Sequence, residues 1–401
     1  MSNVLRDRHI ALGITGSIAA YKAADLASKL TQAGARVDVL MTDAAARFIA
    51  PLTLRGLTGR PVFLDMFDPV TELAEEHVEI ARRADIVIVA PAGADTIARL
   101  AQGRADDMVS LTVLATTAPV LIAPAMDNQM FEREATQANL RTLCERGYVV
   151  VGPAEGRLAS GRTGKGRLVE TDVLIGALKH ELGRRRGDLV GRRVVVTAGG
   201  TREPLDPVRF ISNYSSGKMG YALAEAARDR GADVRLVSTV SALAAPYGVC
   251  LVPVQTVAEM RDAVLAACQP GAALIMAAAV SDYRPADRAD RKVKKGPDRK
   301  SIELERNADF LLEVPDSVVK VGFAAETHDL VANAKAKLQE KRLDLIAAND
   351  VTAPGSGFAV DTNQVTILDR TGGVEELPLL SKYEAAQRLL DRVAPLLRQR
   401  M

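Results

Sequence analysis

The sequence predicts an α/β protein with two doubly wound, mostly parallel sheets of the Rossmann type, one in each half of the chain. Short apolar runs rich in β-branched residues alternate with helical stretches, which is the pattern of parallel strands joined by helices. Most of these runs end in glycine, proline or small residues, where a buried strand turns into a loop. A chain of 401 residues is also long enough for two or three domains, each with its own core.

Composition excludes several classes of function. The chain is 48% apolar and 25% charged, as soluble proteins are, and no apolar run approaches the length of a membrane span. Tryptophan is absent, aromatic residues make up 4% and the net charge is only +2, so we expect no nucleic-acid partner. The three cysteines form no CxxC pair, which argues against a structural zinc and for a reducing compartment. We therefore expect a cytoplasmic protein.

Four buried strands are expected in the first half, at residues 9–15, 37–41, 85–89 and 120–123. The first is followed by a turn at Gly16-Ser17 and a helix through Leu30, and Thr42 stands at the end of the second. The third is closed by residues 90–94 and the fourth by residues 124–126. Because ligands of parallel sheets bind beyond the carboxyl ends of the strands, these loops are candidates for a ligand site.

The second half opens with a βαβ unit that has an oversized first loop. A strand at 194–196 ends in Gly199-Gly200, and a helix from about Lys218 to Arg230 ends at Gly231. A helix N-terminus with cations nearby is a ready anion site, although glycine spacing alone favours an ordinary capping loop. The other expected elements are strands at 233–237, 249–254, 272–278 and 345–351, and helices at 257–268 and 381–398.

The domain boundary is expected near Asp188. From Lys179 the chain becomes basic and is broken by glycines, in KHELGRRRGDLVGRR, which is typical of a helix end followed by a linker. This division predicts domains at 1–187 and 188–401. The arginine run in this stretch is more simply a solvated helix end than a nucleic-acid patch.

Two longer motifs in the second half are far more specific than glycine spacing. GGTREP (199–204) followed by ISNYSSGKMG (211–220) resembles the phosphopantothenate–cysteine ligase half of the bifunctional decarboxylase/ligase of coenzyme A synthesis. The resemblance implies that this half couples 4′-phosphopantothenate to cysteine through an acyl-cytidylate made from CTP with Mg²⁺, for which the sequence identifies no ligands. It also implies that Asn213 acts on the acyl-cytidylate.

A lysine-rich loop in the second half can be interpreted as a solvated surface loop or as a nucleotide-binding loop. Lys292-Val293-Lys294-Lys295 is by composition a solvated charge run, yet a lysine loop beside a phosphate site can close over a triphosphate and neutralise it. The resemblance favours the second reading and implies that Lys292 stabilises charge on the nucleotide phosphates. The residues that it implies for CTP binding are Ala278, Asp282, Lys292, Ala308, Asp309, Phe310, Leu311, Phe323, Lys337 and Lys341.

Three motifs in the first half carry a second resemblance. GITGSIAAYKAADLA (13–27) lacks the full GxGxxG spacing, but together with APAGADTIARLAQGRADD (90–107) and PAMDNQM (124–130) it resembles the flavin-dependent cysteine decarboxylases, which bind FMN. The resemblance covers residues 8–180 and implies decarboxylation of 4′-phosphopantothenoylcysteine to 4′-phosphopantetheine. The residues that it implies near the flavin are Ser17, Thr42, Pro91, Ala92, Asp95 and Met126.

A histidine of the first half takes its role from this resemblance alone. His77 lies in a helical stretch among glutamates, where a lone histidine is more often a solvated side chain. The resemblance places an active-site histidine at this position. Its imidazole would take the proton of the substrate thiol.

Two residues depart from the decarboxylase pattern. Asp127 stands where the family has an asparagine that holds the substrate carboxylate, and an ionised carboxylate repels another one. Asp127 could hold the substrate carboxylate if it were protonated, or Asn128 could hold it instead. The sequence leaves both possibilities open. Ser160 stands where well-known relatives have a proton-donating cysteine, and a hydroxyl is a much weaker acid than a thiol. Both changes are read first as tolerated variation.

Three readings of the whole chain follow. The leading one is a two-step enzyme with both activities. The second keeps the ligase and treats the flavin half as an inactive assembly scaffold, because of Asp127 and Ser160. The third, a nicotinamide oxidoreductase, rests only on generic βαβ patterning. The resemblance further implies decarboxylase trimers and ligase dimers, which would build a homo-dodecamer.

Overall fold

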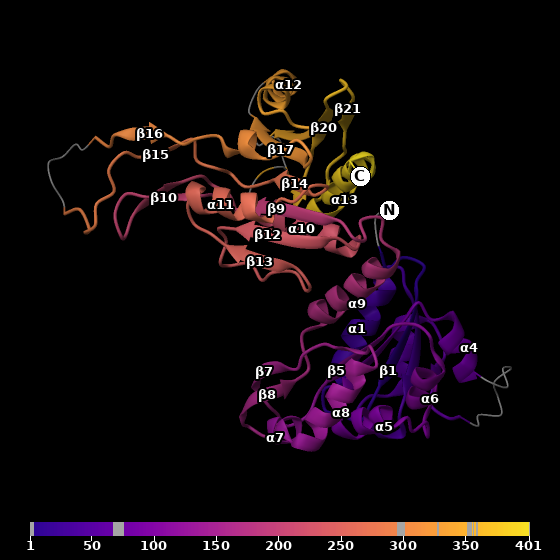
Figure 1. Ribbon diagram of the computed structural model, residues 1–401. Coiled ribbons are helices and arrows are strands. Elements are labelled where there is room, and N and C mark those ends of the chain that lie inside the picture. Colours follow the sequence, from indigo (N-terminus) through magenta and orange to yellow (C-terminus); the bar gives the residue numbers. More distant parts are fainter. Residues whose placement is uncertain are drawn as a thin grey trace. The chain divides into compact units, whose positions relative to one another are not determined.

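A computed structural model describes residues 4–66, 76–294, 301–326, 329–350, 355, 357 and 360–400 (Figure 1). The chain forms two compact units, of which one is Asn3–Leu182 and the other begins at Gly183. Helix α9 (Thr171–Arg186) runs through this division, which lies five residues before the expected boundary at 187/188. Among the described residues, no helix combines the length and the apolar character that a bilayer crossing requires.

The N-terminal unit is built on a six-stranded sheet in which all neighbouring strands are parallel. The strand order is β3 (Val62–Phe63), β2 (Arg36–Met41), β1 (His9–Ile14), β4 (Ile86–Ala92), β5 (Val120–Pro124) and β6 (Val149–Val150). The remaining described elements are α1 (Ala20–Gln32), α2 (Asp43–Ala46), α3 (Pro51–Thr58), α4 (Glu76–Arg83), α5 (Ala94–Gln102), α6 (Met108–Ala115), α7 (Asn128–Glu132), α8 (Glu134–Glu145) and the hairpin β7 (Ala154–Arg157)–β8 (Thr163–Arg167). The doubly wound parallel sheet is the predicted fold.

The four expected strands of this unit form because their apolar runs are buried on both faces of a parallel sheet. Leu12, Val39, Ile88 and Leu121 have no exposed surface. One expectation was wrong in detail, because β4 does not end at Val89. The strand continues after an irregularity in register and pairs Ala92 with Pro124, so the residues read as a closing turn are still sheet.

The C-terminal unit is built on an eight-stranded sheet. The strand order is β13 (Cys250–Pro253), β12 (Asp233–Ser238), β9 (Arg193–Ala198), β14 (Ala273–Met276), β17 (Val319–Glu326), β18 (Leu345–Asp350), β20 (Thr366–Asp369) and β21 (Val374–Glu376). The strands are parallel as far as β18, and β20 and β21 add an antiparallel edge. The mostly parallel character predicted for this half is confirmed.

Helices cover both faces of this sheet. Helices α10 (Lys218–Asp229) and α13 (Lys382–Gln399) share one core cluster, and α11 (Val257–Ala267) and α12 (Leu330–Glu340) belong to the other. The helix expected at 381–398 is α13, and it covers the sheet, because its Leu389, Leu390 and Val393 are buried in the first cluster. The short 3₁₀ helix η1 (Phe310–Glu313) contributes to the second cluster.

The described residues of the C-terminal unit also form three small antiparallel strand pairs outside the main sheet. They are β10 (Arg202–Pro204) with β11 (Phe210–Ser212), β15 (Tyr283–Pro285) with β16 (Leu304–Arg306), and β19 (Thr362–Asn363) with β22 (Leu380–Ser381). Strands β10 and β15 contact each other, and Figure 1 shows them reaching away from the sheet together. The oversized loop expected after β9 is therefore a hairpin that packs beside a second hairpin.

Candidate active sites

The first site lies at the carboxyl ends of β9 and β14, where the strand order of the eight-stranded sheet reverses. The two strand exits are bound to each other, since the Ala279 N–H donates to Gly199 O at 2.8 Å and the Ser281 N–H to Thr201 Oγ1 at 2.9 Å. A Cβ on Gly200 would lie 2.6 Å from the carbonyl oxygen of Asn213. Glycine is required here because the loop after β11 crosses directly over the strand exit.

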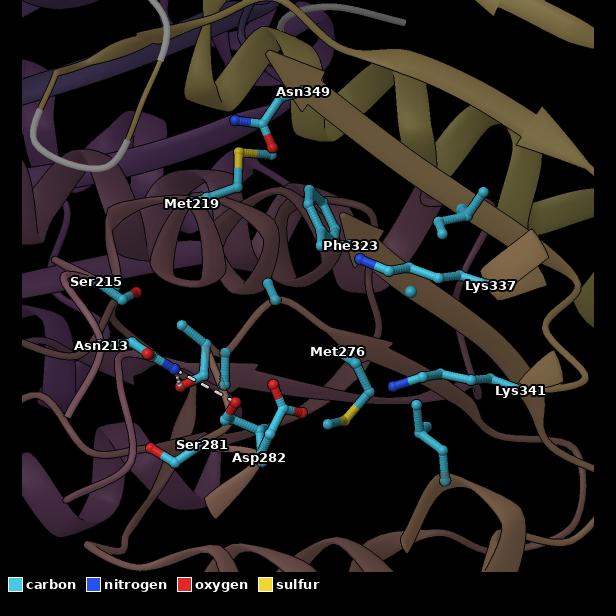
Figure 2. A pocket seen from close by; sticks show the side chains of 18 of the residues that line it. Asn213, Ser215, Met219, Met276, Ser281, Asp282, Phe323, Lys337, Lys341 and Asn349 are labelled. Atoms are coloured by element: carbon cyan, nitrogen blue, oxygen red, sulfur yellow. Dashed lines mark hydrogen bonds between the residues drawn. The ribbon is translucent and has the colours of Figure 1, made fainter. Parts of the chain in front are cut away.

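A cavity of about 690 Å³ opens at this switch point (Figure 2). Asn213 lines it, and so do all but one of the residues expected to bind CTP, namely Ala278, Asp282, Ala308, Asp309, Phe310, Leu311, Phe323, Lys337 and Lys341. Lys292 does not line it, and its side chain is exposed. A volume of this size is ordinary for a nucleotide-sized ligand.

The Asn213 side chain is fixed against the exit of β14. Its amide nitrogen donates to Ala279 O at 3.2 Å and to Val280 O at 3.3 Å, the two bonds drawn in Figure 2. These bonds orient the amide and use both N–H groups of its nitrogen, so its oxygen is the group left to bind a ligand. In the adjacent Ser281 the hydroxyl is buried and has no partner among the described residues.

Cations gather on one wall of the cavity. Lys337 of α12 and Lys341, which follows the helix, extend side by side toward the interior in Figure 2. Lys341 Nζ lies 3.1 Å from a carboxylate oxygen of Asp309, so this lysine is held between two lining segments. The same arrangement gives phosphate oxygens a positive wall.

The cavity also offers carboxylates, but no ready-made metal site. Asp282 and Asp309 line it, and the described residues contain no group of three or more His, Cys, Asp or Glu side chains placed to hold a metal ion. A Mg²⁺ ion in such a cavity takes most of its ligands from water and substrate phosphates, with one or two protein carboxylates.

Several lining residues were not anticipated from the sequence. They are Met219, Glu340, Asn349, Asn363 and Lys382. Asn349 lies near the carboxyl end of β18. The sequence could have indicated it, because ligands of parallel sheets bind at the carboxyl ends of the strands. The sequence around Lys382 does not indicate a ligand site, because α13 brings this residue to the cavity from a distant part of the chain. Its buried ammonium group donates to Gly357 O at 3.0 Å and to Thr362 O at 3.1 Å.

The second site is the corresponding switch point of the N-terminal unit, at the ends of β1 and β4. The Thr15 hydroxyl donates to Pro91 O at 2.8 Å and accepts from the Gly93 N–H at 3.1 Å, so it joins the two strand exits. A cavity of about 790 Å³ opens beside them. A Cβ on Gly16 would lie 2.6 Å from Cβ of Ala44, so only glycine leaves this wall of the cavity intact.

Four of the six residues expected near the flavin line this cavity, namely Ser17, Thr42, Asp95 and Met126. Pro91 and Ala92 are not lining residues, because they lie within β4 and use their carbonyl groups to bind Thr15 and Ala125. His77 lies on α4 and does not line the cavity either. Arg99, Asp106, Asp107 and Met130 are lining residues that the sequence interpretation missed.

The two residues that depart from the decarboxylase pattern are bonded to each other. The Ser160 hydroxyl, at the tip of the β7–β8 hairpin, donates to Asp127 Oδ2 at 2.6 Å, and the Gln129 N–H donates to Asp127 Oδ1 at 3.0 Å. These bonds lower the pKa of the Asp127 carboxyl below its usual range. Asp127 is therefore an ionised acceptor at neutral pH, and Asn128 packs against Gly164 of β8.

Comparison with known proteins identifies both halves. Residues 1–183 match the Flavoprotein family model, and residues 189–397 match the model for the DNA/pantothenate metabolism flavoprotein C-terminal domain. The coenzyme A biosynthesis bifunctional protein CoaBC of Bacillus subtilis (strain 168) is 46% identical over 401 residues, which cover 99% of either chain. The Escherichia coli (strain K12) protein of the same name is 44% identical over 399 residues, 97% of either chain.

A solved structure also matches the C-terminal half. The C-terminal domain of a coenzyme A biosynthesis bifunctional protein CoaBC is 41% identical, covers 53% of this chain and 99% of that chain, and has a TM-score of 0.46. The sequence matches extend over the full length of both curated relatives. The chain belongs to the family of bifunctional coenzyme A biosynthesis proteins.

Proposed function

We propose that this chain catalyses two consecutive steps of coenzyme A biosynthesis. The C-terminal domain, residues 188–401, couples 4′-phosphopantothenate to cysteine with CTP. The N-terminal domain, residues 1–187, decarboxylates the 4′-phosphopantothenoylcysteine so formed to 4′-phosphopantetheine with FMN. Both family models and the full-length relatives support a protein with two activities, and no observation favours the ligase-only alternative.

One observation carries the ligase assignment. Nine of the ten residues expected to bind CTP line one cavity, although they come from segments spread between residues 278 and 341. A carboxylate forms an amide with an amine only after it acquires a leaving group. In an acyl-cytidylate, that leaving group is CMP. We assign Lys337 and Lys341 to the phosphates, Asp282 to a water-bound Mg²⁺, and Asn213 to the acyl-cytidylate intermediate.

The N-terminal cavity fits FMN. Ser17 and the start of α1 offer a site for one phosphate, and the glycine cradle at Gly16 admits a ligand close to the backbone. When bound, FMN would take two electrons from the substrate thiol, which allows the carboxylate to leave as CO₂, and would return them to the decarboxylated product. We assign His77 to the thiol proton, and we assign Asp127 and Ser160 to substrate binding beside the lining residue Met126.

We also propose that the protein is a cytoplasmic homo-oligomer, with decarboxylase trimers and ligase dimers that build a dodecamer. His77, Asp127 and Ser160 lie outside the described cavity of their own N-terminal unit, which supports a decarboxylase site completed by another copy. Light scattering of the purified protein measures the mass directly. A monomeric mass would contradict this part of the proposal.

The two activities separate in one experiment. Purified protein is given 4′-phosphopantothenate, cysteine, CTP and Mg²⁺, and both the cysteine conjugate and CO₂ are followed. We expect wild-type protein to release CO₂, and we expect His77→Asn to accumulate the conjugate at the wild-type rate without releasing CO₂. Accumulation of the conjugate by wild-type protein, with no CO₂, would establish the scaffold alternative instead.

A further inference from the structure

One carboxylate in the β10–β11 hairpin is buried where a loop carboxylate is normally solvated. Asp206 lies between the two short strands, and its side chain has no exposed surface. A buried carboxylate persists only when hydrogen bonds and an opposite charge replace its water. The hydrogen-bond partners of Asp206 therefore show which segments of the chain this carboxylate connects.

Asp206 binds both its own hairpin and the loop that carries Lys292. Oδ1 accepts from the backbone N–H groups of Val208 at 2.8 Å and Arg209 at 2.9 Å, which fixes the turn. Oδ2 accepts from the Arg209 guanidinium at 3.0 and 2.5 Å and from the Val293 N–H at 3.1 Å. The guanidinium in turn donates to Val293 O at 3.1 Å.

The backbone of Val293 is thus held at both of its polar groups by one ion pair. A further bond, from the Ala289 N–H to Leu205 O at 3.0 Å, fixes the same loop four residues earlier. Lys292 directly precedes Val293, so its Cα position is set by these contacts. At the other end of the hairpin, β11 leads directly into Asn213.

We propose that Asp206 is a positioning residue that joins the Asn213 segment to the Lys292 loop, so that the two move as one body during acyl-cytidylate formation. The inference rests on the proposed ligase function. A loop held at its base has less conformational freedom to lose when its lysine meets the nucleotide phosphates. Loss of the contact then lowers kcat and leaves CTP binding to the cavity wall nearly unchanged.

Two variants test this role, and one of them is designed to keep the hairpin folded. Asp206→Asn keeps an oxygen acceptor for the turn N–H groups but presents an NH₂ group to Arg209 and Val293, so the hairpin forms while the contact is lost. Asp206→Ala removes both. Asp290→Ala is the matched control, because Asp290 is an exposed aspartate in the same loop.

The readouts are pyrophosphate release and backbone hydrogen exchange in the full-length protein. We expect both Asp206 variants to lower kcat for pyrophosphate release by about tenfold or more, with KM for CTP within about threefold of wild type. We expect the Val293 amide to exchange faster in both variants and at the wild-type rate in Asp290→Ala. In a Lys292→Gln background, Asp206→Asn should lower kcat no further.

Wild-type kcat in both variants would overturn the proposal, and so would a lowered kcat with unchanged exchange at Val293. An additive effect in the Lys292→Gln background would also overturn it, because Asp206 would then act independently of the lysine. Failure of the proposed function is distinguishable. Wild-type protein would then release no pyrophosphate from CTP, while the exchange rate at Val293 would still report the contact.

Discussion

Asp127 and Ser160 show how two substitutions can make sense only as a pair. The Ser160 hydroxyl donates a hydrogen bond to the Asp127 carboxylate, so the two substituted side chains bind each other where the resembled pattern has an asparagine and a cysteine. An ionised aspartate cannot donate, and the serine proton already has an acceptor. The two positions are 33 residues apart in the sequence, so no local pattern could predict that they meet.

The pairing predicts a measurable change in acidity. The Ser160 hydrogen bond is the largest cause that lowers the pKa of Asp127, so Ser160→Ala should raise that pKa toward the ordinary value of an aspartate. The carboxyl carbon of Asp127 can be titrated by NMR. Thr163→Ala, in the same hairpin, is the control. An unchanged Asp127 pKa in Ser160→Ala would show that the hairpin tip does not contact Asp127 in solution.

At the scale of single elements, helix α10 depends on a glycine that faces the sheet. A Cβ at Gly220 would lie 2.6 Å from Cβ of Ala198 and 2.8 Å from the carbonyl oxygen of Thr197, at the end of β9. Gly220→Ala should therefore destabilise the C-terminal unit by about 1–3 kcal/mol, the usual cost of overpacking. Gly56→Ala is the opposite case, because no atom lies within 4 Å of its added Cβ in α3.

Denaturant unfolding followed by circular dichroism measures both variants. We expect Gly56→Ala to be neutral or to stabilise the N-terminal unit by up to about 1 kcal/mol, through helix propensity. Equal stability of Gly220→Ala and wild type would mean that α10 can move away from β9. The close packing of α10 on the strand that ends at the cavity would then be wrong.

A second element prediction concerns the ion pairs that hold α13. Arg230 is almost fully buried and binds Asp188 at 2.8 and 2.5 Å, Asp391 of α13 at 2.8 Å, and the carbonyl oxygen of Gln387 at 3.1 Å. Arg230→Met leaves two carboxylates without their cation. It should destabilise the C-terminal unit by about 3 kcal/mol.

The stabilisation by the Asp188–Arg230 ion pair should decrease as the pH falls. Burial opposes ionisation of Asp188, but the hydrogen bond and charge of Arg230 outweigh it and lower the pKa of Asp188. A lowered folded-state pKa stabilises the fold above the ordinary aspartate pKa of about 3.9, and the stabilisation is lost as the pH falls below that value. Unfolding of Arg230→Met should depend less steeply on pH between about 4 and 2 than unfolding of wild type. Parallel pH profiles would contradict the assignment.

The elements were largely predictable, because each expected strand and helix has its own local signal. Apolar runs bounded by glycine gave β1, β2, β5, β9 and β12 to within one or two residues. The end of β4 was missed because it is fixed by pairing of Ala92 with Pro124, and pairing is not a local property. The sequence could not show where Lys292 lies for the same reason, since its loop is held by contacts from Asp206 and Leu205, which are distant in sequence.

At the scale of the whole molecule, the two units repeat one design. Each has a parallel sheet whose order reverses beside its first strand, and each has a cavity at that reversal. The expected site residues gathered there because strand-exit motifs of a parallel sheet meet at one edge. Lys382 was not expected, because it reaches its cavity from a helix that carries no motif. Arg99 lies within the 90–107 motif, but the motif does not show which of its side chains face the cavity.

The central claim is that the C-terminal cavity uses CTP to activate a carboxylate, and pyrophosphate release tests it most directly. With 4′-phosphopantothenate, CTP and Mg²⁺ but no cysteine, we expect a burst of about one pyrophosphate per ligase site, as the enzyme-bound acyl-cytidylate accumulates. Addition of cysteine should turn the burst into steady release, and EDTA should abolish both. If the protein releases no pyrophosphate from CTP with all reactants present, the claim is contradicted.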